Sequence, residues 1–258
     1  MSKIVLVIPC YNEAERFLPE QAEQLLVNDQ MNLLLVNDGS TDQTLMALQD
    51  FKSNHQSRVE VLNLDRNLGK AEAVRLGLKQ AIDQGAKVTG YFDADFATPS
   101  EEMLRLTNIL ASSPNTQVLL GARWLHLGAE IERNVWRHYG GRIFATLASA
   151  VLGLKVYDTQ CGAKLFRVNA ALQSSLGENF VSPWAFDVEL LGRLKLELNQ
   201  DEFREVPLSR WLDVAGSKIS FMDMVSATLA LYNIHRALKR QRYSNSRAGH
   251  QGKNSGMS

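Results

Sequence analysis

Cysteine, net charge and long apolar runs are all scarce in this sequence. Only Cys10 and Cys161 occur, and neither stands in a CxxC pair, so a disulfide framework is excluded and a reduced, intracellular setting is expected. The 28 Lys and Arg balance 28 Asp and Glu, which argues against a nucleic-acid partner. With 258 residues, 45% of them hydrophobic, the chain has enough apolar material for a sizeable core.

No apolar stretch is long enough to cross a bilayer. The longest uncharged stretches, Ile143–Leu154 and Met224–Ile234, fall well below the roughly 20 residues that a spanning helix needs. The N-terminal run Ile4–Pro9 is too short for the apolar part of a signal peptide. We therefore expect a cytoplasmic protein that does not span a membrane by itself, with peripheral contact at the cytoplasmic face left open.

Several catalytic motifs are missing as well. The first apolar run is not followed by GxGxxG, Gly69-Lys70 lacks the upstream glycine of a phosphate-binding loop, and neither GxSxG nor HExxH occurs. The 5 histidines are scattered along the chain. Dinucleotide binding, serine hydrolysis and histidine-based metal chemistry therefore have no support.

Short β-branched runs alternate with helical patterns in the first half. Strands are expected at Lys3–Ile8, Leu33–Asn37, Val59–Leu64, Val88–Phe92 and Gln117–Gly121, with helices over Glu15–Val27, from about Thr41, over Lys70–Ala81 and after Pro99. This alternation predicts an α/β fold with a mostly parallel sheet. In such sheets ligands bind beyond the carboxyl ends of the strands.

The second half predicts a different arrangement. Helices are expected over Glu130–Leu152, Trp184–Leu198 and Phe221–Lys239, and strands at Cys161–Val168 and Phe203–Leu208. We expect residues 1–240 to form a single domain and residues 241–258, rich in Ser, Gly, Asn and Arg, to form a disordered basic tail.

Carboxylates follow three of the predicted strands. Glu13 follows the first, Asp38 the second, and Asp93 and Asp95 the fourth. Taken alone, Asp38-Gly39-Ser40 is more typical of a turn with a helix N-cap. Asp93-x-Asp95 places two like charges at the end of an apolar strand, which is costly without a cation. Such oxygen ligands suit Mg²⁺ or Mn²⁺, ions that can bridge phosphates.

Taken together, these segments closely resemble a family 2 glycosyltransferase. The resemblance rests on Val5–Glu13, Val36–Asp42, Asn67–Ala73 and Asp93–Asp95. It implies the GT-A fold, a nucleotide-binding sheet with an acceptor-side second half, and a nucleotide-sugar donor. It also implies that Asp93 and Asp95 hold the metal on the donor diphosphate. The donor contacts that it implies are Pro9, Tyr11, Glu13, Asp38, Ser40 and Lys70.

The second half is similar to the polyprenyl-phosphate sugar transferases. The matching segments are Gly121–Arg123, Asp158–Phe166, Trp184–Leu191 and Gly216–Lys218. The nearest resemblance is to the dolichyl-phosphate glucosyltransferases, and the mannosyltransferases come next. Mannosyl enzymes usually place a glutamine two residues after the DxD, whereas Phe96 and Ala97 follow here. The resemblance therefore implies UDP-glucose as donor and a polyprenyl phosphate as acceptor, with GDP-mannose as the alternative donor.

A phosphate acceptor needs cations more than it needs a protein base. Its second pKa is about 6, so it is mostly ionised at pH 7, and cationic side chains must hold it in line with the sugar C1. Direct attack would invert the anomeric centre. The candidates for holding the acceptor phosphate are Arg123, Arg133, Arg137 and Lys218. Arg133 and Arg137, spaced i,i+4, also fit a solvated helix face.

Asp187 has two interpretations. It is either the base that a saccharide-hydroxyl acceptor would require, or a support that orients a Lys, an Arg or a sugar hydroxyl. With a phosphate acceptor we favour the support. Cys161 has no histidine partner and is expected to be a packed thiol. Trp184 and Phe186 fit an acceptor groove or the core. A catalytically silent nucleotide-sugar-binding module is a further hypothesis, which the pair Asp93 and Asp95 disfavours.

Two segments are candidates for contact with a membrane surface, where a polyprenyl phosphate resides. Ile143–Leu154 is unusually apolar, and Phe221–Lys239 is amphipathic and basic at its end. A basic amphipathic helix binds an anionic leaflet with about 1 kcal/mol per positive charge near the surface. A final helix that packs on the core, followed by a solubilising tail, explains the second pattern equally well.

Overall fold

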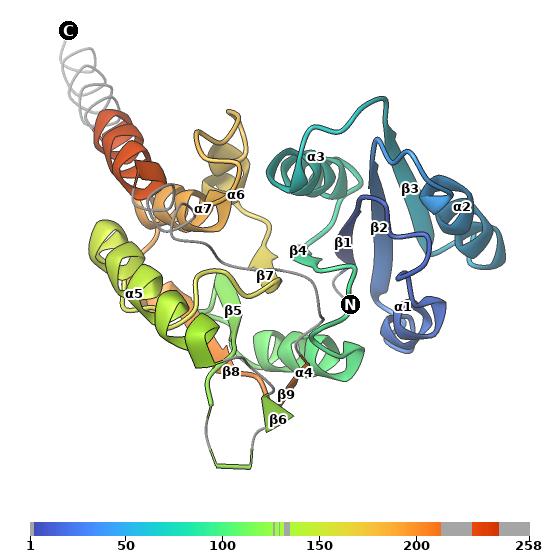
Figure 1. Ribbon diagram of the computed structural model, residues 1–258, viewed down its shortest axis with the longest axis horizontal. Coiled ribbons are helices and arrows are strands. Elements are labelled where there is room, and N and C mark those ends of the chain that lie inside the picture. The colour runs from blue at the N-terminus through green and yellow to red at the C-terminus, as the bar shows by residue number, and fades with distance from the viewer. Residues whose placement is uncertain (1–2, 126, 129, 132–134, 213–228, 243–258) are drawn as a thin grey trace, which may run out of the picture.

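The computed structural model describes residues 3–125, 127–128, 130–131, 135–212 and 229–242, without the side chains of 135–143. Within them, a seven-stranded sheet has the order β3-β2-β1-β4-β7-β5-β8 (Figure 1). Its strands are β1 (Ile4–Cys10), β2 (Met31–Asp38), β3 (Val59–Leu64), β4 (Val88–Phe92), β5 (Val118–Ala122), β7 (Ala163–Arg167) and β8 (Phe203–Pro207). All neighbouring pairs are parallel except those of β7, which runs antiparallel to both β4 and β5. The sheet is thus mostly parallel, as predicted.

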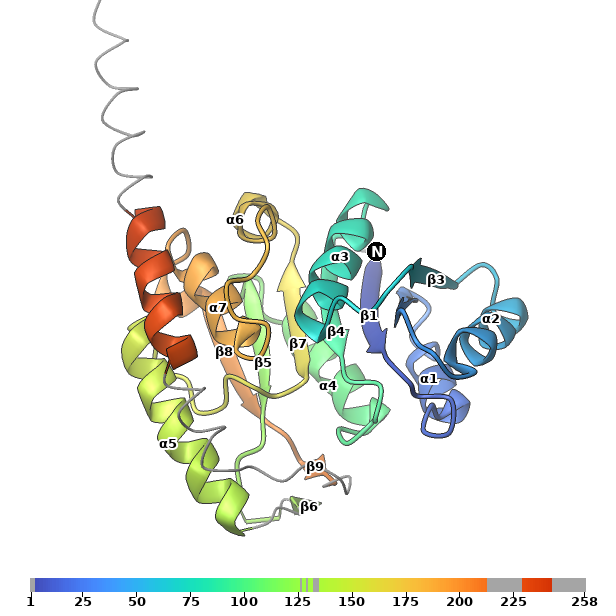
Figure 2. The same cartoon turned by 45° about the horizontal axis from the view of Figure 1, so that its top comes forward.

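Helices cover both faces of this sheet (Figures 1 and 2). They are α1 (Pro19–Leu25), α2 (Thr44–Asn54), α3 (Lys70–Asp83), α4 (Ser100–Ala111), α5 (Val135–Leu152), α6 (Ala170–Ser175) and α7 (Phe186–Lys195), together with helical residues 229–242. Alternate residues of β1 point to opposite faces. Val5 and Val7 therefore join the core beneath α3, α5 and α7, whereas Leu6 and Ile8 join the one beneath α1, α2 and α4.

The predicted elements of the first half are confirmed, with shifted ends. Helix α1 is shorter than the expected Glu15–Val27 and begins at Pro19, a residue whose fixed φ suits the first helical position. The segment Glu130–Leu152, expected to be one helix, instead starts with strand β6 (Glu130–Ile131), which pairs with β9 (Arg210–Trp211). That pairing joins segments far apart in the chain, so no local pattern in the sequence could reveal it.

The helix expected over Phe221–Lys239 lies outside the described residues up to 228; its described part packs on the core. Leu231, Ile234 and Leu238 are buried in the cluster beneath α5 and α7, while Arg236 and Lys239 are exposed. Its apolar face is therefore occupied, which supports the core-packing alternative. Within the described residues, no helix has both the length and the apolar character needed to cross a bilayer. The tail predicted at 241–258 lies outside the described residues from 243 onward.

Candidate active site

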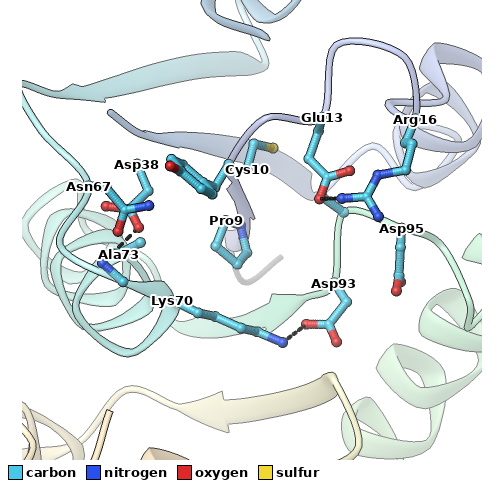
Figure 3. Close-up of a pocket in the computed structure, with 13 residues that line it drawn as sticks. Pro9, Cys10, Glu13, Arg16, Asp38, Asn67, Lys70, Ala73, Asp93 and Asp95 are labelled. Carbon is cyan, nitrogen blue, oxygen red and sulfur yellow. Dashed lines mark hydrogen bonds and ion pairs between the residues drawn. The ribbon is translucent and has the colours of Figure 1, made fainter. Parts of the chain in front are cut away.

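A pocket of about 330 Å³ opens where the carboxyl ends of β1, β2 and β4 meet the start of α3 (Figure 3). This is the edge of the sheet at which the sequence predicted a ligand. Two acidic residues from the loop after β4, Asp93 and Asp95, line it. The predicted donor-binding residues that line it are Pro9, Tyr11, Glu13, Asp38 and Lys70.

Ser40 braces the pocket from outside its lining. Its hydroxyl accepts a hydrogen bond from the backbone N–H of Asn12 at 3.0 Å. The Asn12 side chain in turn accepts the N–H of Thr41 at 2.9 Å. Asn12 has a φ of 51°, a left-handed conformation that asparagine tolerates better than most residues. These bonds tie the loop after β1 to the loop after β2 and so fix the position of Tyr11 and Glu13.

Asp38 uses both carboxylate oxygens to hold the start of α3. They accept the backbone N–H groups of Leu68 at 2.7 Å and of Gly69 at 2.9 Å. Burial raises the pKa of Asp38, and the two N–H groups oppose that shift. The adjoining Gly39 packs so tightly that an added Cβ would lie 2.1 Å from the carbonyl carbon of Arg66. Asp38 thus lines the pocket, and it also holds Gly69, the residue directly before Lys70.

Lys70 and Asp93 form an ion pair across the pocket. The Lys70 Nζ lies 2.6 Å from Oδ1 of Asp93 (Figure 3). Although burial favours the neutral acid, the Lys70 ammonium holds the pKa of Asp93 below its usual range. The Asp93 N–H donates to the carbonyl of Gly162 at 3.0 Å. A Cβ on Gly162 would lie 2.0 Å from Oδ2 of Asp93, so the carboxylate rests directly on a bare α-carbon.

Two further carboxylates make the pocket strongly acidic. One oxygen of Glu13 pairs with Arg16 at 2.8 Å, while its Oε2 is buried without a hydrogen-bond partner. Burial raises the pKa of Glu13. Burial and the nearby Asp93 charge also raise the pKa of Asp95, whose Oδ1 accepts the N–H of Ala97 at 3.1 Å. Both shifts indicate negative charge that a bound cation would stabilise.

The carboxylate oxygens at the pocket fit a divalent cation that binds together with a phosphate ligand. Among the described residues, no three His, Cys, Asp or Glu side chains form a preassembled metal cage. Mg²⁺ and similar ions are commonly held by only one or two carboxylates, with substrate phosphates completing the coordination. Asp95, at the pocket and beside Asp93, has the chemistry for this, and the Lys70 ammonium already balances part of the charge on Asp93.

Arg123 lies after β5 and is held by a bidentate ion pair. Its Nε and Nη2 contact the two carboxylate oxygens of Asp158 at 2.7 and 2.9 Å. The guanidinium carbon lies 5.5 Å from the ring centroid of Trp211. Glu205 fixes Asp158 in turn by accepting its backbone N–H at 2.7 Å. These contacts make Arg123 a rigid cation beside the pocket rather than a part of its lining.

Asp187 lies in the first turn of α7. It is buried, and Oδ1 accepts hydrogen bonds from the Lys164 ammonium at 2.7 Å and from the Tyr91 hydroxyl. Burial raises the pKa of Asp187 to about 7. This surrounding fits the supporting interpretation, because the carboxylate orients a lysine. Cys161 is fully buried, as predicted, and burial raises its pKa to about 11.

Three predicted acceptor residues are not placed. Arg133 and Lys218 lie outside the described residues, and Arg137 lies in α5 with its side chain outside them. Of the two aromatic candidates, Phe186 is buried in the core and Trp184 is 53% exposed. Trp184 contacts Phe144 edge to face, with 5.0 Å between the ring centroids.

The profile of Glycosyl transferase family 2 matches residues 5–173. This chain belongs to glycosyl transferase family 2. The dolichyl-phosphate beta-glucosyltransferase of Drosophila melanogaster is 32% identical to this family 2 chain over 239 residues, covering 84% of this chain and 69% of that protein. The undecaprenyl-phosphate 4-deoxy-4-formamido-L-arabinose transferase of Proteus mirabilis is 27% identical over 190 residues, covering 70% of this chain and 55% of that protein.

A solved structure supports the fold of this family 2 glycosyltransferase. The glucosyl-3-phosphoglycerate synthase of Mycobacterium tuberculosis, in complex with Mn²⁺, UDP and glucosyl-3-phosphoglycerate, aligns with a TM-score of 0.67 and 16% sequence identity. The match covers 92% of this chain and 80% of that one. The chain therefore has the GT-A fold, as predicted.

Several residues at the site of this family 2 enzyme received no role from the sequence. Arg16 is three residues after Glu13, a spacing that could have indicated their ion pair. Asp158, Gly162 and Lys164 stand in a segment that carried the family resemblance, yet nothing in the pattern showed what each side chain contacts. Their roles depend on neighbours from other strands.

Proposed function

We propose that this glycosyltransferase moves glucose from UDP-glucose to a polyprenyl phosphate with inversion at the anomeric carbon. The curated relatives support the acceptor, because their names share a polyprenyl phosphate. The related synthase supports the donor, since it was solved with UDP and Mn²⁺. The observation that carries the proposal is the pocket at the end of β4, where Lys70 pairs with Asp93 beside Asp95. Residues 1–240 would act as one catalytic domain.

The donor would lie along the loops after β1 and β2. Pro9 and Tyr11 would supply an apolar wall for the nucleoside, and the buried, unpartnered Oε2 of Glu13 would accept a hydrogen bond from it. Asp38 and Ser40 would act mainly by holding these loops and the start of α3. Lys70 would reach the diphosphate with its ammonium and balance the charge that develops on the leaving group.

A divalent cation held by Asp95 and Asp93 would stabilise the diphosphate as a leaving group. The acceptor phosphate would attack C1 directly, because it is ionised and needs no base. Arg123, fixed by Asp158, would hold that phosphate together with Arg133, Arg137 and Lys218. The ammonium or guanidinium charges would also offset the repulsion between two phosphate groups that meet at one carbon.

A peripheral contact with the cytoplasmic face of the membrane follows from a lipid acceptor. Because the apolar face of residues 229–242 is buried, this contact would be electrostatic and would use the exposed charges at the end of that helix. These charges belong to Arg236, Lys239, Arg240 and Arg242.

The proposal predicts which donor labels lipid. With radiolabelled UDP-glucose, polyprenyl phosphate and Mn²⁺, label is expected in the organic extract, whereas GDP-mannose in a parallel reaction gives none. EDTA should abolish the transfer and excess Mn²⁺ should restore it. Lipid label from GDP-mannose alone would identify GDP-mannose, and not UDP-glucose, as the donor. Absence of lipid label from either donor would contradict the proposal and favour a saccharide acceptor.

Asp187→Asn tests the nature of the acceptor. The variant keeps the shape of the side chain but removes a base, so transfer to polyprenyl phosphate should fall only about tenfold, through weaker orientation of Lys164. Transfer to a saccharide hydroxyl would instead need the base and should fall roughly 10²- to 10⁴-fold. Initial rates with each acceptor, and with the exposed helix variant Asp50→Asn as control, measure the difference. Complete loss with the phosphate acceptor would contradict the supporting role of Asp187.

A further inference from the structure

Lys164 is a fully buried lysine next to the pocket. It lies on β7, opposite Tyr91 of β4, and none of its surface is exposed to solvent. Burial lowers the pKa of Lys164 to about 8. Removing an ammonium group from water is expensive unless geometry and hydrogen bonds compensate.

The ammonium of Lys164 joins three parts of the fold. It donates to Oδ1 of Asp187, on α7, at 2.7 Å and to the carbonyl of Cys161, in the turn before β7, at 2.5 Å. It also lies 5.1 Å from the ring centroid of Tyr91 on β4, whose hydroxyl donates to the same Asp187 oxygen. Lys164 thus fixes the carbonyl at position 161 against a helix and a central strand.

The residue after that carbonyl shapes the pocket. Gly162 accepts the backbone N–H of Asp93 at 3.0 Å, and its α-carbon supports the Asp93 carboxylate so closely that a Cβ would lie 2.0 Å from Oδ2. Any movement of the turn would therefore move the surface on which the carboxylate rests. A continuous series of contacts therefore connects Asp187, through Lys164 and the turn at Cys161–Gly162, to the Asp93 carboxylate.

We propose that Lys164 is a positioning residue that, with Asp187 and Tyr91, holds the turn at Cys161–Gly162 and thereby sets the place of the Asp93 carboxylate. The inference rests on the proposed function for the role of Asp93 toward the donor diphosphate and its cation. A pair that only stabilised the fold would be replaceable by apolar residues, because buried ion pairs exchanged for well-packed hydrophobic side chains are often neutral or stabilising. A positioning pair would not be replaceable.

The test separates stability from positioning. Lys164→Met should lower the Tm by roughly 10 °C, since it leaves the buried Asp187 without its lysine. The double variant Lys164→Met with Asp187→Leu should regain most of that loss. In isothermal titration with UDP and Mn²⁺, both variants are expected to bind about tenfold more weakly than the wild type. Binding of the double variant within about twofold of wild type would overturn the proposal.

A second buried pair in α7 provides the matched control. Arg193 and Glu189 contact each other at 2.6 Å and are nearly fully buried, but they hold backbone groups of residues 175–182. Arg193→Met should lower the Tm similarly and leave UDP binding unchanged. Equal loss of binding in this control would assign the effect to general loosening and overturn the proposal. If Lys164→Met does not fold, Lys164→Gln, which can still donate to Cys161, replaces it in the same titration.

Crystal structures of the wild type and the double variant decide the inference without reference to activity. The turn at 161–162 and the Asp93 carboxylate should be displaced by about 1 Å or more, or occupy several positions, in the variant. An unchanged Asp93 would overturn the proposal. A wild-type protein that binds neither UDP nor GDP with Mn²⁺ would count against the proposed function, while these structures would still test the position of Asp93.

Discussion

Asp95→Asn is expected to lower kcat for glucose transfer by roughly 10²- to 10³-fold. Asparagine keeps the side-chain shape and retains an oxygen for the Ala97 N–H, which now bonds Asp95 at 3.1 Å. It removes only the negative charge, which burial and the neighbouring Asp93 already make costly in the absence of a cation. A variant without that charge should therefore need a much higher concentration of Mn²⁺ to support transfer.

Initial rates over a series of Mn²⁺ concentrations measure this effect. Asp50→Asn makes the same chemical change on the exposed side of α2, away from the pocket, and should match the wild type. Asp95→Asn with a rate within about threefold of wild type at every concentration would show that its charge is not needed, and would remove Asp95 from the proposed cation site.

Gly162→Ala is expected to reduce kcat by about 10²-fold, since misplacement of a catalytic group by 1 Å can cost that much. An added Cβ would lie 2.0 Å from Oδ2 and 2.1 Å from Cγ of Asp93. The carboxylate must then turn away from Lys70, or β7 must separate from β4. The clash is also expected to cost about 1–3 kcal/mol of stability, as overpacked sites do.

A second substitution shows whether Asp93 is the cause. Gly162→Ala combined with Asp93→Ala should regain thermal stability, because the clashing carboxylate is gone, but should stay inactive. Gly177→Ala, in the turn after α6 and away from the pocket, provides a control in which the added Cβ also meets a tight contact, 3.2 Å from the Ser174 carbonyl oxygen, but far from Asp93. Wild-type activity in Gly162→Ala would mean that the Asp93 carboxylate tolerates displacement.

Sequence patterns determined the layered α/β architecture and the edge of the sheet that carries the pocket. Strands such as Ile4–Cys10 and Val118–Ala122 are runs without charged side chains, which is typical of strands buried on both faces. Because the carboxyl ends of parallel strands converge, the acids after β1, β2 and β4 could be placed together from the chain order alone. Glu13, Asp38 and Asp93 do line one pocket.

Only the tertiary structure decided what these side chains contact. The pairing of β7 between β4 and β5 brings Gly162 against the Asp93 carboxylate and Lys164 opposite Tyr91, from positions about 70 residues away in the chain. Lys70 pairs with Asp93 across 23 residues of sequence in the same way. Such contacts depend on strand order and packing. The spacing of apolar residues along a strand indicates which of its faces is buried, but it does not indicate which strand lies beside it.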